Sequence, residues 1–283
     1  MTGTATANIV QRLWNLCNIL RDDGITYQDY VTELTYLLFL KMLAETGREE
    51  ILPKDCRWDS LTAREGDALL NHYRALLLKL GQSSHTGVRA VFVDAQTSLR
   101  KPANLRELVG QIDKLDWYSA KEEGLGDLYE GLLEKNAAEK KSGAGQYFTP
   151  RQLIDCMVRL LKPQPGEVIQ DPAAGTGGFL VAADRFIKQQ SDELFALPKP
   201  QQEFQRREAF RGLELVPDTH RLLVMNLLLH DIDPDNVKGG DTLGPDGEAL
   251  GQADVILTNP PFGTKKGGGR PVRSDFTITP DTS

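Results

Sequence analysis

Cysteine is scarce in this sequence, and the few cysteines are widely separated. Only three occur in 283 residues, at Cys17, Cys56 and Cys156. None has the short paired spacing that marks a zinc site, and three scattered cysteines do not form a disulfide framework. We therefore expect no metal site, and we expect a reducing compartment, the cytoplasm.

Long apolar runs and a basic leader are also missing. No stretch approaches the roughly twenty apolar residues that a membrane span requires. The first eight residues, Met1 to Asn8, are small and polar, with no basic region followed by an apolar one. The sequence therefore predicts no membrane contact and no secretory signal.

Positive charge is in short supply as well. The formal net charge is −7, although 40% hydrophobic and 26% charged residues are an ordinary globular balance. A protein that grips nucleic acid unaided is usually basic, because phosphate contacts supply much of its affinity. If a chain of this charge acts on DNA, either a partner supplies positively charged contacts to the phosphates or the chain's own basic residues are clustered.

The spacing of apolar residues divides the chain into two parts. Ile9, Leu13, Leu16 and Leu20 recur at helical intervals, and similar stripes continue to about residue 141. Residues 1–141 are therefore expected to form an all-helical domain. The small residues 142–145 are a candidate hinge, and residues 142–283 are expected to form a second domain.

The second part alternates short apolar strands with helices. Thr149 and Pro150 predict the N-cap and first residue of a helix. The polar segment 189–207, with two prolines, is interpreted as a surface excursion. Strands are expected at 167–170, 210–215, 237–241 and 253–258, and helices at 179–188 and 217–230. Such alternation predicts an α/β fold with a doubly wound parallel sheet.

A glycine-rich segment, Asp171 to Gly178, follows the first expected strand and opens a helix. Open α/β sheets bind ligands at this position, and glycines let the backbone approach a ligand closely. Two other interpretations remain. In the first, the glycines serve steric needs alone. The second, a dinucleotide site, is disfavoured because Leu180 stands where a third glycine belongs.

Two acidic residues end later strands. Glu214 is expected at the end of the second strand, where a carboxylate commonly holds the hydroxyls of a ribose. Asp241 is expected at the end of the third strand and could bind an adenine ring. The alternatives are a solvated acid for Glu214 and an ordinary turn residue for Asp241.

The tetrapeptide Asn259-Pro260-Pro261-Phe262 directly follows the last expected strand. Two prolines fix the backbone and remove two N–H donors. The Asn259 side-chain oxygen and the Pro260 carbonyl remain as acceptors, and an aromatic ring follows. A planar amino group such as adenine N6 has two hydrogens to donate and a face to stack. This pattern favours a functional site over a rigid turn with a core Phe262.

Taken in order, these motifs resemble those of the amino-group DNA methyltransferases of the gamma type. More narrowly, the chain is similar to the modification subunit of type I restriction–modification systems, over essentially its whole length. The resemblance includes the helical region around Leu37–Lys41. The motifs are Gln146-Tyr147-Phe148-Thr149-Pro150, then Asp171 to Gly177, then Glu214, then Asn259 to Phe262.

The resemblance implies an adenine-specific DNA methyltransferase that uses S-adenosylmethionine. Its implied fold is an N-terminal all-helical bundle followed by an incomplete doubly wound methyltransferase sheet. Glu214 would bind the ribose and Asp241 the adenine of the cofactor. Asn259, Pro260, Pro261 and Phe262 would be catalytic. The methionine end would be surrounded by Gln146, Tyr147, Phe148, Thr149, Pro150, Arg151, Asp171, Ala173, Gly175, Thr176, Gly177 and Gly178.

The resemblance also implies partners. These are DNA, a specificity subunit that reads the target sequence, a second copy of the modification subunit, and a restriction subunit that can join them. Lys265, Lys266, Arg270 and Arg273 are expected to form a DNA-facing loop, with a solvated tail as the alternative. Relatives continue past this point, so we expect a truncated chain whose last strand is left at an edge.

Two other functions remain open. Methyltransferases of a second class act on a glutamine amide of a protein through a similar tetrapeptide, but usually with Tyr where Phe262 stands. A non-enzymatic alternative is a module that only binds other subunits.

Overall fold

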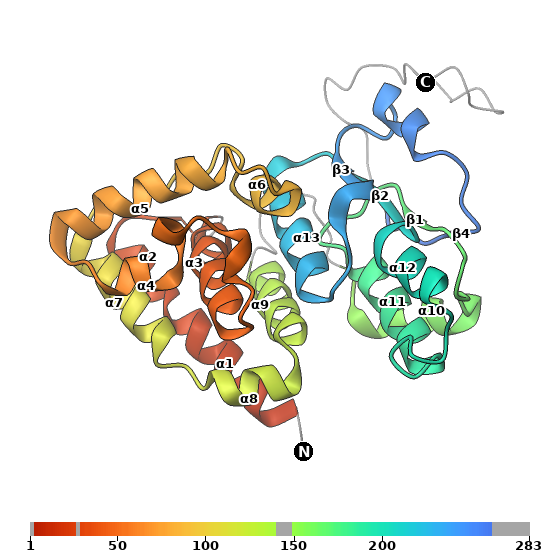
Figure 1. Cartoon of the computed structure of the whole chain (residues 1–283), viewed down its shortest axis with the longest axis horizontal. Helices are drawn as coiled ribbons and strands as arrows, with labels where there is room; N and C mark the ends of the chain where they lie inside the picture. The colour runs from red at the N-terminus through yellow and green to blue at the C-terminus, as the bar shows by residue number, and fades with distance from the viewer. Residues whose placement is uncertain (1–2, 27–28, 140–148, 262–283) are drawn as a thin grey trace. The chain divides into compact units, whose positions relative to one another are not determined.

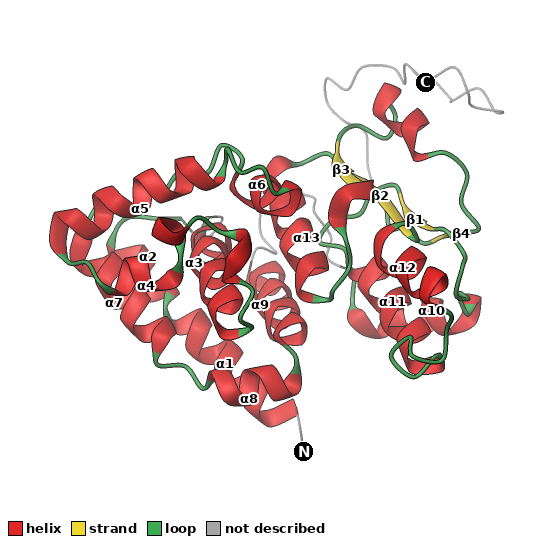
Figure 2. Cartoon of the chain, in the orientation of Figure 1, coloured by secondary structure: helices red, strands yellow, loops and turns green. Residues whose placement is uncertain are grey.

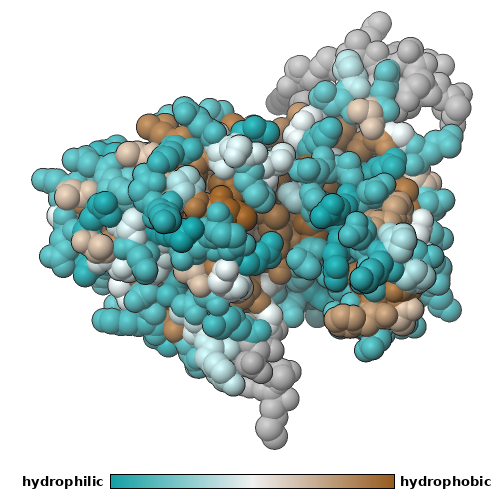
Figure 3. All heavy atoms as spheres, in the orientation of Figure 1, coloured by the Kyte–Doolittle hydropathy of each residue, from teal (hydrophilic) through white to brown (hydrophobic). Residues whose placement is uncertain are grey.

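The computed structural model describes residues 3–26, 29–139 and 149–261. The chain divides into two compact units, Met1–Ala144 and Gly145–Ser283 (Figure 1). The boundary expected at 141/142 lies outside the described residues. On the face shown in Figure 3, hydrophilic residues cover most of the surface, and apolar residues form smaller patches between them. Within the described ranges, every helix is too short or too polar to span a membrane.

In its described residues, the first unit is built from helices alone (Figure 2). This agrees with the all-helical N-terminal region that was predicted. The helices are α1 (Gly3–Asn15), α2 (Cys17–Asp22), α3 (Tyr30–Glu45), η1 (Glu49–Ile51), η2 (Lys54–Cys56), α4 (Trp58–Thr62), α5 (Gly66–Leu80), α6 (Thr86–Phe92), α7 (Pro102–Asp113), α8 (Trp117–Glu123) and α9 (Leu125–Glu139).

Helix α3 lies at the centre of this unit. Its sequence is apolar on every side, and from Tyr30 to Leu43 all residues but Thr32 are buried. A helix without a polar face has to be surrounded by other elements. Helices α4, α7 and α9 supply part of that surrounding layer.

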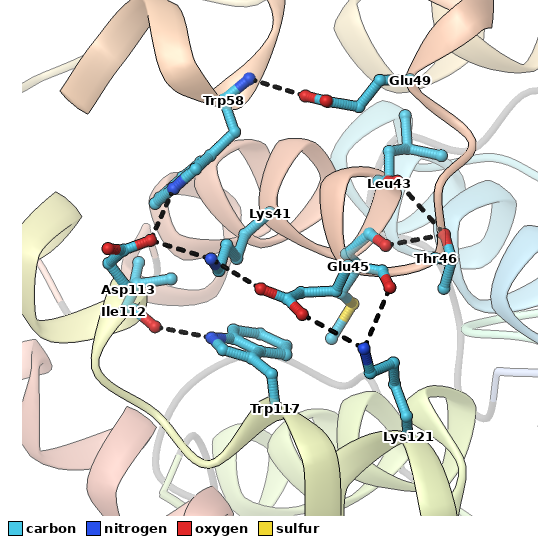
Figure 4. Close-up of polar contacts among 11 residues, drawn as sticks. Lys41, Leu43, Glu45, Thr46, Glu49, Trp58, Ile112, Asp113, Trp117 and Lys121 are labelled. Carbon is cyan, nitrogen blue, oxygen red and sulfur yellow. Dashed lines mark hydrogen bonds and ion pairs between the residues drawn. The ribbon is translucent and has the colours of Figure 1, made fainter. Parts of the chain in front are cut away.

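Two charged residues of α3, Glu33 and Lys41, are buried, and Lys41 is the cation. Its ammonium group lies 2.7 Å from Glu45 Oε1 and 2.8 Å from Asp113 Oδ1. It also lies 5.4 Å and 5.9 Å from the ring centres of Trp58 and Trp117 (Figure 4). The charge is therefore paired on both sides, as a buried cation requires, and it links α3 to α4, α7 and α8.

The described residues of the second unit form a parallel sheet with the strand order β3-β2-β1-β4. Ile169 aligns with Phe210 on one side and with Val255 on the other. The elements are α10 (Arg151–Leu161), β1 (Ile169–Asp171), α11 (Gly178–Gln190), α12 (Lys199–Arg207), β2 (Phe210–Glu214), α13 (Pro217–Leu229), η3 (Pro234–Asn236), β3 (Val237–Gly239), η4 (Pro245–Leu250) and β4 (Val255–Ile256).

Apolar faces of the helices close the core of this unit over the sheet. Helix α11 packs against β1 and α10, and α13 packs against β2 and β3. The alternation of strands and helices that the sequence predicts is confirmed, and so is the α/β fold class. The core comprises Ile154, Val158, Ile169, Ala174, Phe179 to Ala183, Ile187, Leu194, Ala209, Phe210, Leu223, Leu227, Ile232, Val237 and Leu257.

Three expectations about this unit need correction. Segment 189–207 is largely exposed, as a surface excursion would be, but it contains helix α12, and Pro200 lies in the first turn of that helix, where proline is tolerated. Helix α10 has Pro150 rather than Thr149 at its N-cap. Strand β3 ends at Gly239, so Asp241 lies in the turn beyond it.

Candidate cofactor and catalytic site

The carboxyl ends of the parallel strands meet at one edge of the sheet. From β1 the chain winds outward through β2 to β3, and it then returns to place β4 on the other side of β1. Such a switch in winding leaves a crevice beyond the strand ends, where open α/β sheets bind ligands. Asp171 ends β1, Glu214 ends β2, and Asn259 follows β4 by three residues.

Asp171 is buried, with 1% of its surface exposed. Its Oδ1 accepts a hydrogen bond from the Ala173 N–H at 3.1 Å. Burial raises the pKa of Asp171 to about 6, while the nearby Thr258 hydroxyl and the Ala173 N–H oppose this shift in part. A buried carboxylate with so little compensation destabilises its own fold, so Asp171 is suited to a cationic or hydroxyl-bearing ligand.

Glu214 joins the end of β2 to the glycine-rich loop. Its Oε2 accepts from the Gly175 N–H at 2.9 Å, and its Oε1 accepts from the Val216 N–H at 2.8 Å. Burial raises the pKa of Glu214, and these two N–H groups oppose the rise. Each oxygen keeps a lone pair, because a carboxylate has about four acceptor positions.

The loop between β1 and α11 depends on its glycines in two different ways. Gly177 has φ +86°, and an added Cβ would lie 2.6 Å from Leu223 Cδ1. Gly175 has φ +56°, and an added Cβ would meet nothing within 4 Å. The positive φ favours glycine at both positions; Gly177 also packs against Leu223 of α13, whereas Gly175 borders open space that a ligand can enter.

Asn259 is oriented by a residue far away in the sequence. Its Nδ2 donates a hydrogen bond to Thr149 Oγ1 at 3.0 Å. With the nitrogen of the carboxamide engaged, Oδ1 is the atom offered as an acceptor. Pro260 and Pro261 are exposed directly beyond it.

Asp241 and Arg151 lie in positions that do not by themselves indicate a binding role, and the remaining predicted residues named below lie outside the described residues. Asp241 accepts from the Leu243 N–H at 3.0 Å through Oδ1, in the manner of a turn residue. Arg151 is the first residue of α10, next to Pro150. Gln146, Tyr147, Phe148, Phe262, Lys265, Lys266, Arg270 and Arg273 lie outside the described residues.

Several residues at this edge were not predicted. Leu215 and Leu243 are 51% and 54% exposed, just beyond β2 and β3. Asn226 of α13 donates from Nδ2 to the Thr176 carbonyl at 2.9 Å. A polar residue within the apolar run 222–229 was the signal that could have revealed Asn226.

Together, these features define a class of protein. An open parallel sheet presents a glycine-rich loop and two carboxylates at its switch point, which is an arrangement suited to a nucleotide-like cofactor. An oriented carboxamide follows the neighbouring strand.

Family models match both parts of the chain. The model described as N-6 DNA Methylase matches residues 120–281, and the HsdM N-terminal domain matches residues 9–112. The chain belongs to the N-6 DNA methylase family. The predicted similarity to modification subunits of type I restriction–modification systems is thereby confirmed.

Individual relatives agree with the family models. The chain is 53% identical over 270 residues to the type I restriction enzyme StySPI methylase subunit of Salmonella potsdam, covering 92% of this chain and 51% of that protein. It is 52% identical over 270 residues to the EcoKI methylase subunit of Escherichia coli K12, with the same coverage. The chain thus spans about half the length of the curated relatives it matches.

A solved structure shows the same fold. A modification subunit ascribed to a type I restriction enzyme from Vibrio vulnificus YJ016 superposes with a TM-score of 0.74 at 26% identity. The match covers 93% of this chain and 63% of the other chain.

Proposed function

We propose that this chain is the cofactor-binding and catalytic portion of a type I modification subunit, which methylates N6 of adenine in DNA. The observation that carries the proposal is the Asn259 carboxamide, held through Nδ2 by Thr149 at 3.0 Å beside the switch point. Asp171 and Glu214 lie at the ends of the adjacent strands of the same sheet.

S-adenosylmethionine is the proposed cofactor, and when bound it supplies an electrophilic methyl group on a sulfonium. The described residues fit this molecule. Asp171 offers a buried carboxylate for an ammonium group, and Glu214 keeps lone pairs for two ribose hydroxyls. The backbone at Gly175 is open to close approach. Leu215 and Leu243 offer apolar surface for the adenine ring.

The proposed target is an adenine flipped out of the DNA duplex, because a stacked base hides its amino group. Asn259 Oδ1 and the Pro260 carbonyl would accept the two N6 hydrogens and direct the nitrogen lone pair. Phe262, outside the described residues, would stack on the base. Aligning two reactants in this way can supply much of a rate enhancement.

Partners would complete the assembly. The net charge of −7 favours a complex in which a specificity subunit reads the DNA. A second modification subunit and a restriction subunit are the further partners proposed. Lys265, Lys266, Arg270 and Arg273 are the chain's own proposed DNA contacts. We place the chain in the cytoplasm, which fits its free cysteines Cys17, Cys56 and Cys156.

Methyl transfer to adenine-containing duplex DNA, measured with a specificity subunit present, tests the proposal. Asn259→Ala should lower the rate about 100-fold, as expected when a donor or acceptor for the transition state is lost. Thr149→Val should lower it about 10-fold by freeing the carboxamide, and Thr149→Ser should retain it. Cofactor affinity, followed by calorimetry, should be unchanged in Asn259→Ala.

Three results would count against the proposal. Undiminished transfer by Asn259→Ala would remove Asn259 from catalysis. Absence of S-adenosylmethionine binding by the wild-type chain would favour the subunit-binding module. Transfer to a glutamine amide of a protein, in place of DNA, would favour the other class of methyltransferase.

A further inference from the structure

Asn226 of α13 is a buried amide whose presence stability alone does not explain. It is 1% exposed, and its Nδ2 donates to the Thr176 carbonyl at 2.9 Å. Its Oδ1 is buried without a hydrogen-bond partner among the described residues. A buried unpaired oxygen opposes folding, so leucine, which has a similar shape, would serve the core better. The hydrogen bond to Thr176 is therefore the contact that accounts for an amide at this position.

Thr176 lies in the glycine-rich loop, at the point where α13 covers that loop. Gly177, the next residue, approaches α13 so closely that an added Cβ would lie 2.6 Å from Leu223 Cδ1. Leu223 precedes Asn226 by about one helical turn. Packing at Gly177 and the hydrogen bond at Thr176 thus join two consecutive loop residues to the same face of α13.

The strand that leads into α13 holds the preceding loop residue. Glu214 ends β2 and accepts from the Gly175 N–H at 2.9 Å, and α13 begins three residues later at Pro217. One strand–helix unit therefore fixes Gly175 through a carboxylate and Thr176 through an amide. The two contacts attach consecutive loop residues to the end of β2 and to the last turn of α13.

We propose that Asn226 is a positioning residue for the cofactor loop. It holds the Thr176 carbonyl so that Gly175 stays on Glu214 and the loop keeps the shape that binds the cofactor. The identity of the cofactor rests on the proposed function, whereas the effect of Asn226 on the loop does not.

The main test separates binding from stability. Asn226→Leu removes the donor together with the unpaired oxygen. We expect its affinity for S-adenosylmethionine, measured by calorimetry on the full chain, to fall about 10-fold. Its thermal midpoint should be equal to or above that of the wild type. A role in general packing would instead lower stability and leave affinity unchanged.

Two further variants keep the test decisive. Asn226→Asp keeps the size of the side chain but sets an acceptor against the Thr176 carbonyl, so it should also weaken binding even if the leucine variant folds poorly. Ile187→Val is the matched control, because Ile187 belongs to the core cluster that includes Leu223 and Leu227 but lies near the end of α11 that is far from the loop in sequence. It should lower stability slightly and leave affinity unchanged.

Hydrogen exchange in the ligand-free chain gives a measurement that does not depend on the cofactor. In Asn226→Leu, the Gly175 and Gly177 amides should exchange about 10-fold faster, with core amides of α11 unchanged. Wild-type loop exchange and wild-type affinity in both Asn226 variants would overturn the inference. If the wild-type chain binds no S-adenosylmethionine, the cofactor assignment fails, and loop exchange alone decides the role of Asn226.

Discussion

The buried cation of the helical unit allows a quantitative test of what stabilises that unit. Lys41 Nζ lies 2.8 Å from Asp113 Oδ1, and Trp58 Nε1 donates to the same oxygen at 2.9 Å (Figure 4). Glu45 supplies a second anionic partner at 2.7 Å. Asp113→Ala would therefore remove two hydrogen bonds to a carboxylate, of which the one from Lys41 is also an ion pair, and would leave Lys41 with a single carboxylate.

The magnitude follows from the burial of each partner. Removing one partner of a fully buried ion pair costs about 3–5 kcal/mol. The Asp113 side chain is 46% exposed, and Glu45 remains in place, so the expected loss of unfolding free energy is nearer to about 2 kcal/mol. In a Lys41→Met background the same change removes only the bond from Trp58, and about 1 kcal/mol is expected.

The assay can report on this unit alone. The three tryptophans of the chain, Trp14, Trp58 and Trp117, all lie in the helical unit. Urea unfolding followed by tryptophan fluorescence therefore measures its stability for the wild type, both single variants and the double variant. A loss below about 0.5 kcal/mol for Asp113→Ala, or an equal loss in both backgrounds, would refute the reasoning.

Two further predictions concern the sheet unit. A carboxyl whose folded pKa is raised favours the folded state at low pH and loses that contribution as pH rises through the folded value, which is about 6 for Asp171. Asp171→Asn should thus stabilise this unit at about pH 8 but not at about pH 4, and it should weaken cofactor binding. Hydrogen exchange of core amides measures the stability at each pH. Equal stability gains at both pH values would contradict this prediction. Gly177→Ala should lower the free energy of unfolding by about 2 kcal/mol, because of its positive φ and its clash with Leu223, whereas Gly175→Ala should reduce cofactor affinity more than stability. Thermal melting measures the stability of both variants, and calorimetry measures their cofactor affinity. A larger stability loss in Gly175→Ala than in Gly177→Ala would contradict the loop geometry.

The fold was predictable because its signals are local and repeat along the chain. Apolar spacing of the helical type marks the first unit, and short apolar runs separated by glycines mark strands such as β1 and β2. Exact helix starts depend on competing partners. Thr149 has the side chain of an N-cap, but its hydroxyl accepts from Asn259 instead, 110 residues away.

The site was predictable only where a residue type and its strand end coincide. The sequence placed Asp171 at the end of β1 and Glu214 near the end of β2, and their binding of a cofactor stays a prediction. Asn226 was not predicted because it lies within the apolar run of α13, where its sequence neighbours reveal only burial. Its meaning depends on the loop that packs against α13, and that contact is a property of the tertiary structure.

The proposed cofactor binding and the proposed methyl transfer can be tested separately. The described residues proposed to hold the cofactor lie at the ends of β1 and β2, in the loop between β1 and α11, in the turn after β3 and at the start of α10, within one compact unit. The 283-residue chain is therefore expected to bind S-adenosylmethionine by itself. Methyl transfer also needs a flipped base, which depends on DNA held by partners. Binding without transfer would thus leave Asp171, Glu214 and Asn226 in their proposed roles and would locate the deficit in the presentation of DNA to Asn259.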